Sequence, residues 1–149
     1  LRAPGHVKSL LDHLGVHWFA HRPDPRMFNK TAVIITQSIG APNKEAQKDV
    51  KTCLNWLGVS RVKKIGFGMM EGVIWNEISE ARRAKFERKI RKFARQFHDL
   101  TPANRSLKTK FIFQMCKMMQ TLLSKKTPEG QELSPDLQHW IDNGWVVRK

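Results

Sequence analysis

The stretch "KTAVIITQSIGAPNKEAQ", Lys30 to Gln47, decides the fold that we expect for this chain. Four consecutive apolar residues, Ala32 to Ile35, run into a loop that contains one glycine and one proline, and a helix-like pattern follows directly. A strand that is buried on both faces of a parallel sheet has a continuous apolar run of this kind. In α/β proteins, ligands bind just beyond the carboxyl ends of such strands. The stretch therefore predicts a buried parallel strand that carries a ligand loop.

The residues that follow complete a β–α–β unit. The apolar side of the expected helix recurs at i, i+4, i+7, i+8 and i+11, and consists of Ala46, Val50, Cys53, Leu54 and Leu57. Asn43 is the expected N-cap, Gly58 the expected left-handed C-terminal cap, and Arg61 to Met70 a second strand. Strands joined in this way run parallel. Two strands cannot cover their own faces and edges, whereas sheets average about five or six strands, so the sheet is expected to be incomplete.

A strongly basic helix is expected after the second strand, with Asn76 as its cap. Its apolar stripe consists of Phe86, Ile90, Phe93, Ala94 and Phe97. The rest of its circumference holds Arg82, Arg83, Lys85, Arg88, Lys89, Arg91, Lys92 and Arg95. This pattern indicates a helix that covers the sheet with its apolar stripe and keeps its charges in solvent.

Two more helices are expected near the end of the chain. The first opens at Thr101-Pro102, and its apolar side, expected in the core, consists of Phe111, Met115, Met118, Met119 and Leu122. The second is short and runs from Ser134 through Trp140.

The composition is that of a globular protein, with 40% hydrophobic and 27% charged residues among 149. Lys and Arg number 27 against 13 Asp and Glu, an excess that attracts polyanions such as nucleic acid or phosphorylated cofactors. No apolar run approaches 18 residues, so no membrane insertion is expected. Two cysteines without CxxC spacing indicate a reducing cytoplasm. Because the chain begins without Met, we expect that a segment precedes Leu1.

The chain shows few signals of direct chemistry. The loop after the first strand has neither a Walker pattern nor GxGxxG, but Gly40 would let its backbone approach a flat polar ligand. His13, His17 and His21 are spaced by four, yet Gly15 and Pro23 interrupt a helix there, so no metal site is expected. Paired carboxylates and nucleophile motifs are also lacking, and a cofactor would have to carry any enzymatic chemistry.

The order of these segments resembles that of flavodoxin-like NAD(P)H-dependent FMN reductases and quinone oxidoreductases. The family's K-x-F-x-D-R helix, aromatic-His-Arg-Pro loop, G-K-x-A-x-V-I strand and Thr/Gly-rich loop are followed by a helix that ends in Leu-Gly. The corresponding segments here are Lys8 to His13, Phe19 to Pro23, Asn29 to Ile35, Thr36 to Ala41, and Leu57-Gly58. The tail "SPDLQHWIDNGWVVRK" is similar to the ending of some members. The resemblance covers most of the chain and is strongest over residues 6–98.

This resemblance implies a flavodoxin-like α/β sheet that lacks its first strands and its phosphate-binding loop. Residues 1–98 would be the C-terminal portion of that domain, and residues 99–149 a helical extension. The family's geometry implies a cofactor site whose ring-contacting loop is Thr36, Gln37, Ser38, Ile39 and Gly40. The tail of a preceding flavin loop would be Pro4, Gly5 and His6. The family often has two or three glycines where only Gly40 remains here.

The implied function is hydride transfer from NAD(P)H to FMN N5 and onward to a small-molecule electron acceptor, with no catalytic side chain assigned. A homo-oligomer is the expected assembly. Activity is expected to be impaired in this chain, since the phosphate loop is missing. Two other functions stay open on the sequence. One is a basic, non-enzymatic module that binds an anionic partner such as nucleic acid. The other is a half-domain that completes its sheet with a strand from another chain.

Overall fold

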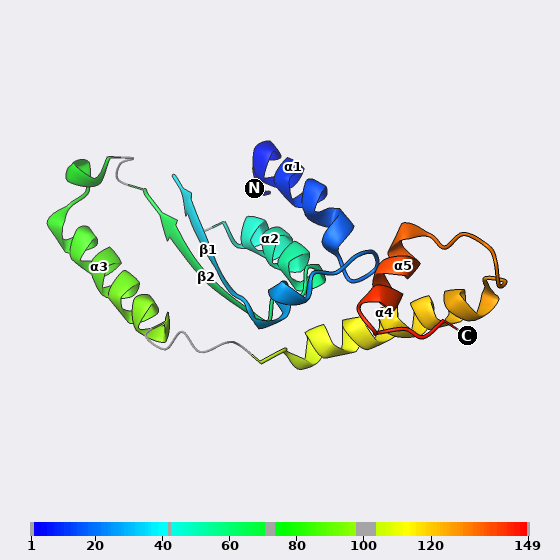
Figure 1. The fold of residues 1–149 in the computed structure, drawn as a ribbon. Helices are drawn as coiled ribbons and strands as arrows, with labels where there is room; N and C mark the ends of the chain where they lie inside the picture. The colour runs from blue at the N-terminus through cyan, green and yellow to red at the C-terminus, as the bar shows by residue number, and fades with distance from the viewer. Residues whose placement is uncertain (1, 42, 71–73, 98–103, 149) are drawn as a thin grey trace.

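The computed structural model describes residues 2–41, 43–70, 74–97 and 104–148 (Figure 1). Within these ranges the chain forms two β-strands, five α-helices and four short 3-10 helices. In chain order they are α1 (Gly5–His13), η1 (Leu14–His17), η2 (Pro25–Asn29), β1 (Thr31–Ser38), α2 (Lys44–Trp56), β2 (Arg61–Gly68), η3 (Trp75–Glu77), α3 (Glu80–Ala94), η4 (Arg95–Phe97), α4 (Leu107–Lys126) and α5 (Pro135–Asp142).

The predicted β–α–β unit is confirmed, but the prediction that its first strand is buried is wrong. Only Ile34 of β1 is buried, because the two-stranded sheet of the described residues places no further strand beside it. β1 and β2 pair in parallel along their whole length, with Thr31 opposite Arg61 and Ser38 opposite Gly68. Gly58 ends α2 with a positive φ of 92°, as expected for a left-handed cap. Asn43 precedes α2 at the N-cap position, but its side chain makes no capping hydrogen bond. The described residues form a two-stranded sheet and so a mixed α/β fold with an incomplete sheet.

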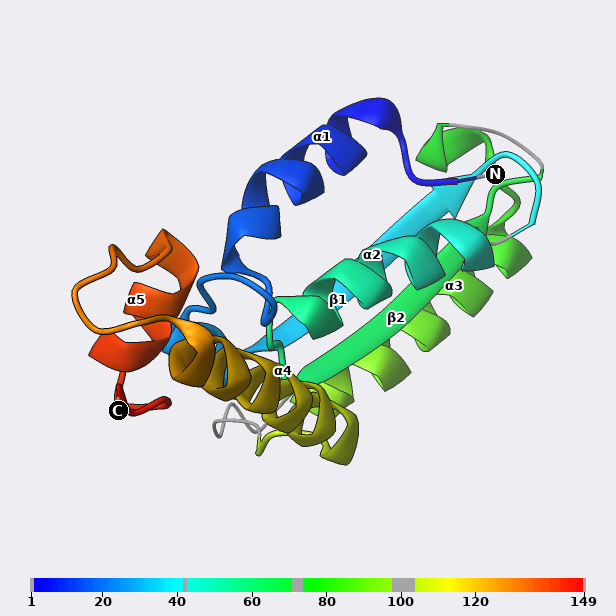
Figure 2. The ribbon, with the colours of Figure 1, turned by 90° about the vertical axis from the view of Figure 1, so that its right-hand side faces the viewer.

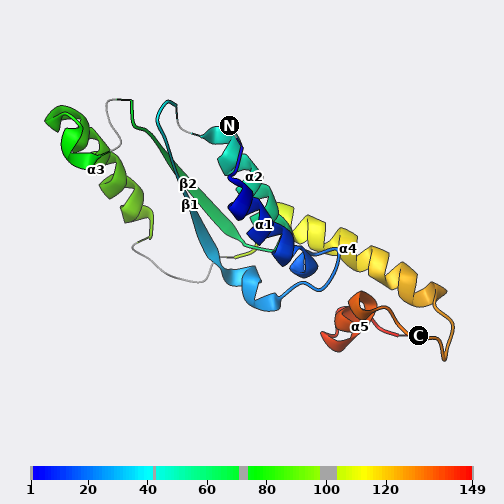
Figure 3. The ribbon, with the colours of Figure 1, turned by 90° about the horizontal axis from the view of Figure 1, so that it is seen from above.

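The helices lie on both sides of this narrow sheet. Seen from above, α1 and α2 lie on one side of the strands and α3 lies on the other (Figure 3). Figure 2 shows the same arrangement with α2 in front of the strands and α3 behind them. Alternate residues of β1 face α2. They include the buried Ile34 and the half-buried Thr36, whose hydroxyl oxygen accepts a hydrogen bond from Gln47.

The prediction that α3 buries its whole apolar stripe is wrong. Phe86 is buried with Met69 and Ile78, but the Ile90 side chain is 45% exposed. Phe93 and Phe97 are only half-buried, and their rings contact each other with centroids 5.2 Å apart. The physical reason is that two strands offer too little surface to cover a helix of 15 residues.

The helix also begins later than expected, because its N-cap is Ser79. The expected cap, Asn76, lies in η3 instead.

An aromatic core joins the segment before β1 to the last two helices. The rings of Phe19 and Phe28 lie 5.5 Å apart, and those of Phe113 and Trp140 lie 5.2 Å apart within the same buried cluster. The Trp140 indole N–H donates to the carbonyl oxygen of His21 over 2.7 Å. This core takes side chains from both of the segments divided at residue 98.

The apolar side predicted for α4 is wrong. The buried side chains of this helix are Thr109, Ile112, Phe113, Cys116, Gln120 and Ser124. The side chains expected in the core are exposed: Phe111, Met115, Met118, Met119 and Leu122. The reason is that α5 and the Phe19–Phe28 rings pack against the Phe113 side of the helix. The expected start at Thr101-Pro102 lies outside the described residues, and α4 is capped by Ser106, whose hydroxyl oxygen accepts from the Thr109 N–H over 3.1 Å.

α5 agrees with the prediction of a short last helix. It begins after Ser134, whose hydroxyl oxygen accepts from the Leu137 N–H, and it extends two residues past Trp140.

Candidate functional site

The prediction that Thr36 to Gly40 form a loop is only partly right: Thr36, Gln37 and Ser38 are the last residues of β1 and pair with β2, and only Ile39 and Gly40 lie beyond the strand. Thr36 is half-buried and tied to α2 by the 2.7 Å hydrogen bond from the Gln47 amide. The Ser38 hydroxyl donates to the carbonyl oxygen of Ala41, which closes the turn. The Ser38 carbonyl oxygen accepts from the Met69 N–H over 2.7 Å. These contacts anchor both ends of the loop and leave its middle free to meet a ligand.

The exposed middle of the loop is formed by Ile39 and Gly40. The Ile39 side chain is 73% exposed, and a Cβ added at Gly40 would meet nothing within 4 Å. Behind the loop the packing is tight, since a Cβ on Gly68 would lie 2.0 Å from the Gly40 carbonyl oxygen. The loop therefore presents an open apolar face outward and rests directly on the end of β2.

The N-terminal segment lies beside this loop. Arg2 donates to an Asp49 carboxylate oxygen on α2 over 2.8 Å, and Ala3 is buried. Ala3 and Pro4 line a cavity of about 530 Å³ together with β1 from Ala32 to Gln37 and with side chains of α2; Ile39 and Gly40 are not among its described lining residues. The structure thus brings Pro4 to the same cavity as the first residues of the predicted loop, although the two segments lie more than 30 positions apart in the sequence.

The remaining predicted site residues are less enclosed. Gly5 and His6 form the first turn of α1 and are exposed, and a Cβ at Gly5 would meet nothing within 4 Å. Ser38 is half-buried, and Gln37 is exposed at the mouth of the cavity.

The two outer edges of the sheet differ, a feature that sequence reasoning missed. The carbonyl oxygens of Gly66 and Gly68 point away from β1. Each accepts from a basic side chain of α3: Lys89 to Gly66 over 2.5 Å, and Arg82 to Gly68 over 2.8 Å. The glycines in β2, which leave room for these side chains, were the available signal. α3 therefore closes the edge of β2.

The edge of β1 is open. The carbonyl oxygens of Lys30 and Ser38 point toward β2, where they accept from Arg61 and Met69 respectively. Backbone direction alternates along a strand, so the N–H and C=O groups of the odd-numbered residues, such as Val33 and Ile35, point outward. Within the described ranges no hydrogen bond reaches those groups. The Val33 and Ile35 side chains are 44% and 69% exposed.

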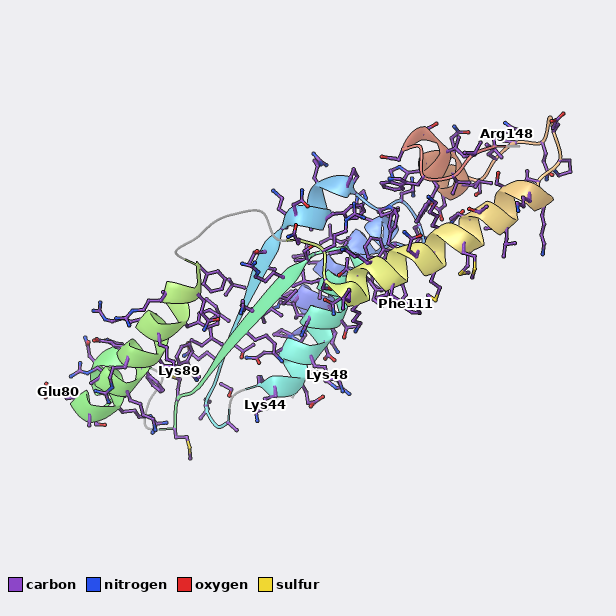
Figure 4. All side chains as sticks on the ribbon, turned by 90° about the horizontal axis from the view of Figure 1, so that it is seen from below. Lys44, Lys48, Glu80, Lys89, Phe111 and Arg148 are labelled. Atoms are coloured by element: carbon purple, nitrogen blue, oxygen red, sulfur yellow. The ribbon has the colours of Figure 1, made fainter. Side chains whose placement is uncertain are left out.

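A basic hollow of about 350 Å³ lies at the other edge, between α2 and α3. Lysines from three elements line it, and none of its described lining residues is acidic: Lys44, Lys64, Lys89 and Lys92. Lys44 on α2 and Lys89 on α3 lie on either side of β2 (Figure 4). This arrangement attracts anions, as the overall charge already indicates.

The structure shows no metal centre in the part of the chain that it describes, where no three His, Cys, Asp or Glu side chains gather around a common point. The imidazoles of His13, His17 and His21 each contact a different acceptor: the Ser9 carbonyl, the Arg22 carbonyl and the Asp136 carboxylate. Burial raises the pKa of the Cys53 and Cys116 thiols, which disfavours reactive thiolates.

Comparison of the chain with protein-family models, curated proteins and solved structures finds no match. None of the helices among the described residues is both long and apolar enough to cross a membrane.

Proposed function

We propose that this chain is part of a flavin-dependent NAD(P)H oxidoreductase of the FMN or quinone reductase type. One observation carries the proposal: the Pro4 segment lines one cavity together with β1 from Ala32 to Gln37, so that the cavity reaches the carboxyl end of this parallel strand. Ligands of α/β proteins bind at that end of the sheet. The resemblance of the sequence to flavodoxin-like reductases adds the identity of the ligand.

The residues present fit the ring of a flavin. The exposed Ile39 side chain offers an apolar surface to a flat ring, and the open space over Gly40 lets the ring approach the backbone. A bound flavin supplies hydride and electron transfer between NAD(P)H and an acceptor. In this proposal the chain orients the ring and excludes water from one of its faces, and no catalytic side chain is assigned.

The same residues fit the flavin phosphate poorly. A flavin phosphate is normally held by a helix N-terminus and its free N–H groups. The hydrogen bonds of Thr36 and Ser38 instead go to α2, to Ala41 and to Met69 after β2. We therefore expect residues 1–149 to bind FMN and riboflavin with similar, weak affinity, because the phosphate gains no partner.

The test is a titration of flavin fluorescence with the chain, using FMN and riboflavin in parallel. Gly40→Val should weaken the binding of both flavins, because the new side chain occupies open space over the loop without touching the fold. Gly130→Ala, in the loop between α4 and α5, is the control and should leave binding unchanged. Absence of binding by both flavins, or equal binding by Gly40→Val, would contradict the proposal.

A second candidate function is assembly with another chain, and the open edge of β1 favours it. Outward backbone groups beside exposed apolar side chains form an edge to which a further strand can add. Ile35→Pro removes one outward N–H and leaves the groups that bond β2 in place. It should abolish self-association measured by analytical ultracentrifugation, whereas Ile35→Thr, which keeps the N–H, should retain it. A wild-type chain that stays monomeric at high concentration would exclude assembly between copies through this edge.

A further inference from the structure

The exposed side of α4 is an apolar surface that the proposed function does not use. Seven large apolar side chains of this helix are between 38% and 85% exposed: Leu107, Phe111, Met115, Met118, Met119, Leu122 and Leu123. At 3.6 residues per turn they occupy one arc of roughly 160°. In Figure 4, where Phe111 is labelled, sulfur-tipped side chains project from α4 on the side away from α5. Contiguous apolar surface of this kind marks an interaction site.

The charges of α4 are all positive. The helix contains five lysines and no acidic residue. Along the helix axis, Lys108 lies near the N-terminal end of the apolar arc and Lys126 near its C-terminal end. The two residues are about 27 Å apart at a rise of 1.5 Å per residue. No ion pair found among the described residues involves either of them. A partner must therefore be apolar opposite the middle of the arc and negative opposite both ends.

These charges disfavour a second copy of the chain. A parallel pair of α4 helices would place Lys108 beside its own counterpart, and an antiparallel pair would place it beside Lys125 and Lys126. The arc is also wider than the strict two-in-seven seam that a single partner helix covers. The partner that matches this surface best is therefore broad and deformable, with an apolar interior beneath negatively charged groups.

We propose that α4 lies flat on the surface of an anionic lipid bilayer. The apolar arc enters the boundary between headgroups and acyl chains, and the lysines at its ends contact lipid phosphates. The opposite side of the helix stays packed on the aromatic core. This contact needs no membrane-spanning segment and is independent of flavin binding.

The test is sedimentation of the chain with vesicles of phosphatidylcholine, alone or mixed with phosphatidylglycerol. We expect binding to the anionic vesicles only, and a loss of more than tenfold for Phe111→Asp/Met118→Asp. The matched control is Met70→Asp/Ile74→Asp, which makes the same charge change at two other exposed apolar residues and should bind like the wild type. Lys108→Gln/Lys125→Gln/Lys126→Gln should bind anionic vesicles on the order of a hundredfold more weakly than the wild type. Its charge-matched control, Lys8→Gln/Lys48→Gln/Lys85→Gln, should lose much less affinity.

All the altered side chains are exposed, so the fold of each variant should stay intact, and circular dichroism checks this. Three results would overturn the proposal. The wild type could fail to bind anionic vesicles. Phe111→Asp/Met118→Asp and its control Met70→Asp/Ile74→Asp could lose vesicle binding equally, which would mean that the change in net charge is the cause. The chain could instead form a dimer that Phe111→Asp/Met118→Asp dissociates, which would assign the arc to a second copy.

Discussion

Gly58 is a position where one added methyl group should damage the fold, for two separate reasons. It lies between α2 and β2 with a φ of 92°, a conformation that L-residues rarely adopt. A Cβ there would lie 2.7 Å from Phe28 Cδ1 and 3.0 Å from Phe19 Cζ, both in the aromatic core. These rings are 3% and 0% exposed, so they have little room to move.

The cost of Gly58→Ala has two parts. The left-handed backbone costs about 1–2 kcal/mol in an L-residue. Overpacking a filled core costs typically about 1–3 kcal/mol more. We therefore expect the free energy of unfolding to fall by about 2–5 kcal/mol. Gly130→Ala is the matched control, because Gly130 has a φ of 85° but no atom within 4 Å of the added Cβ. It should carry only the backbone cost.

Urea denaturation followed by tryptophan fluorescence measures both variants against the wild type. The difference between the two variants isolates the clash with the rings, because the effect of alanine on the unfolded chain is common to both. If Gly58→Ala were no less stable than Gly130→Ala, the aromatic core would not be packed against α2 as described.

Three further predictions use the same measurement or the flavin titration. Phe86→Ala should lower the free energy of unfolding by about 3–5 kcal/mol and Ile90→Ala by less than about 1 kcal/mol, since only the first is buried; equal losses would show that α3 covers the sheet fully. The hydrogen bond from an arginine lowers the pKa of Asp24, so its stabilising contribution is present above about pH 3.9 and is lost as pH falls through the lowered pKa. Asp24→Asn should therefore be less stable than the wild type at pH 6, and a stability gap that did not narrow as the pH falls would refute this cause. Gly68→Ala places a Cβ 2.0 Å from a loop carbonyl oxygen and should weaken flavin binding; unchanged binding would mean that the loop is not the site.

Local patterns in the sequence predicted the central unit correctly. The run from Ala32 to Ile35 and the helical spacing from Ala46 to Leu57 each lie within one element, so their periodicity identified a strand and a helix. Gly58 was recognised as a cap because a left-handed turn requires glycine. Pro4 was singled out only by the resemblance, since no local pattern marks it, and its place in a flavin loop stays a prediction.

The errors arose where burial depends on what packs against an element. In α3 the stripe with Phe86 and Ile90 has the correct period, but the sheet is too narrow to cover it. In α4 two apolar arcs lie side by side, and the sequence does not show which one α5 occupies. The one that α5 covers contains Phe113, and the one that stays exposed contains Phe111.

The most direct test of the central claim is to map where a flavin contacts the chain. Amide chemical shifts of the ¹⁵N-labelled protein, followed by NMR during an FMN titration, report this residue by residue. We predict that the largest changes occur at the amides of the loop from Thr36 to Gly40 and at Gly5 and His6, with little change in α4 and α5. Changes confined to the lysine-lined hollow between α2 and α3 would show that FMN binds only as an anion. That result would contradict the flavin site.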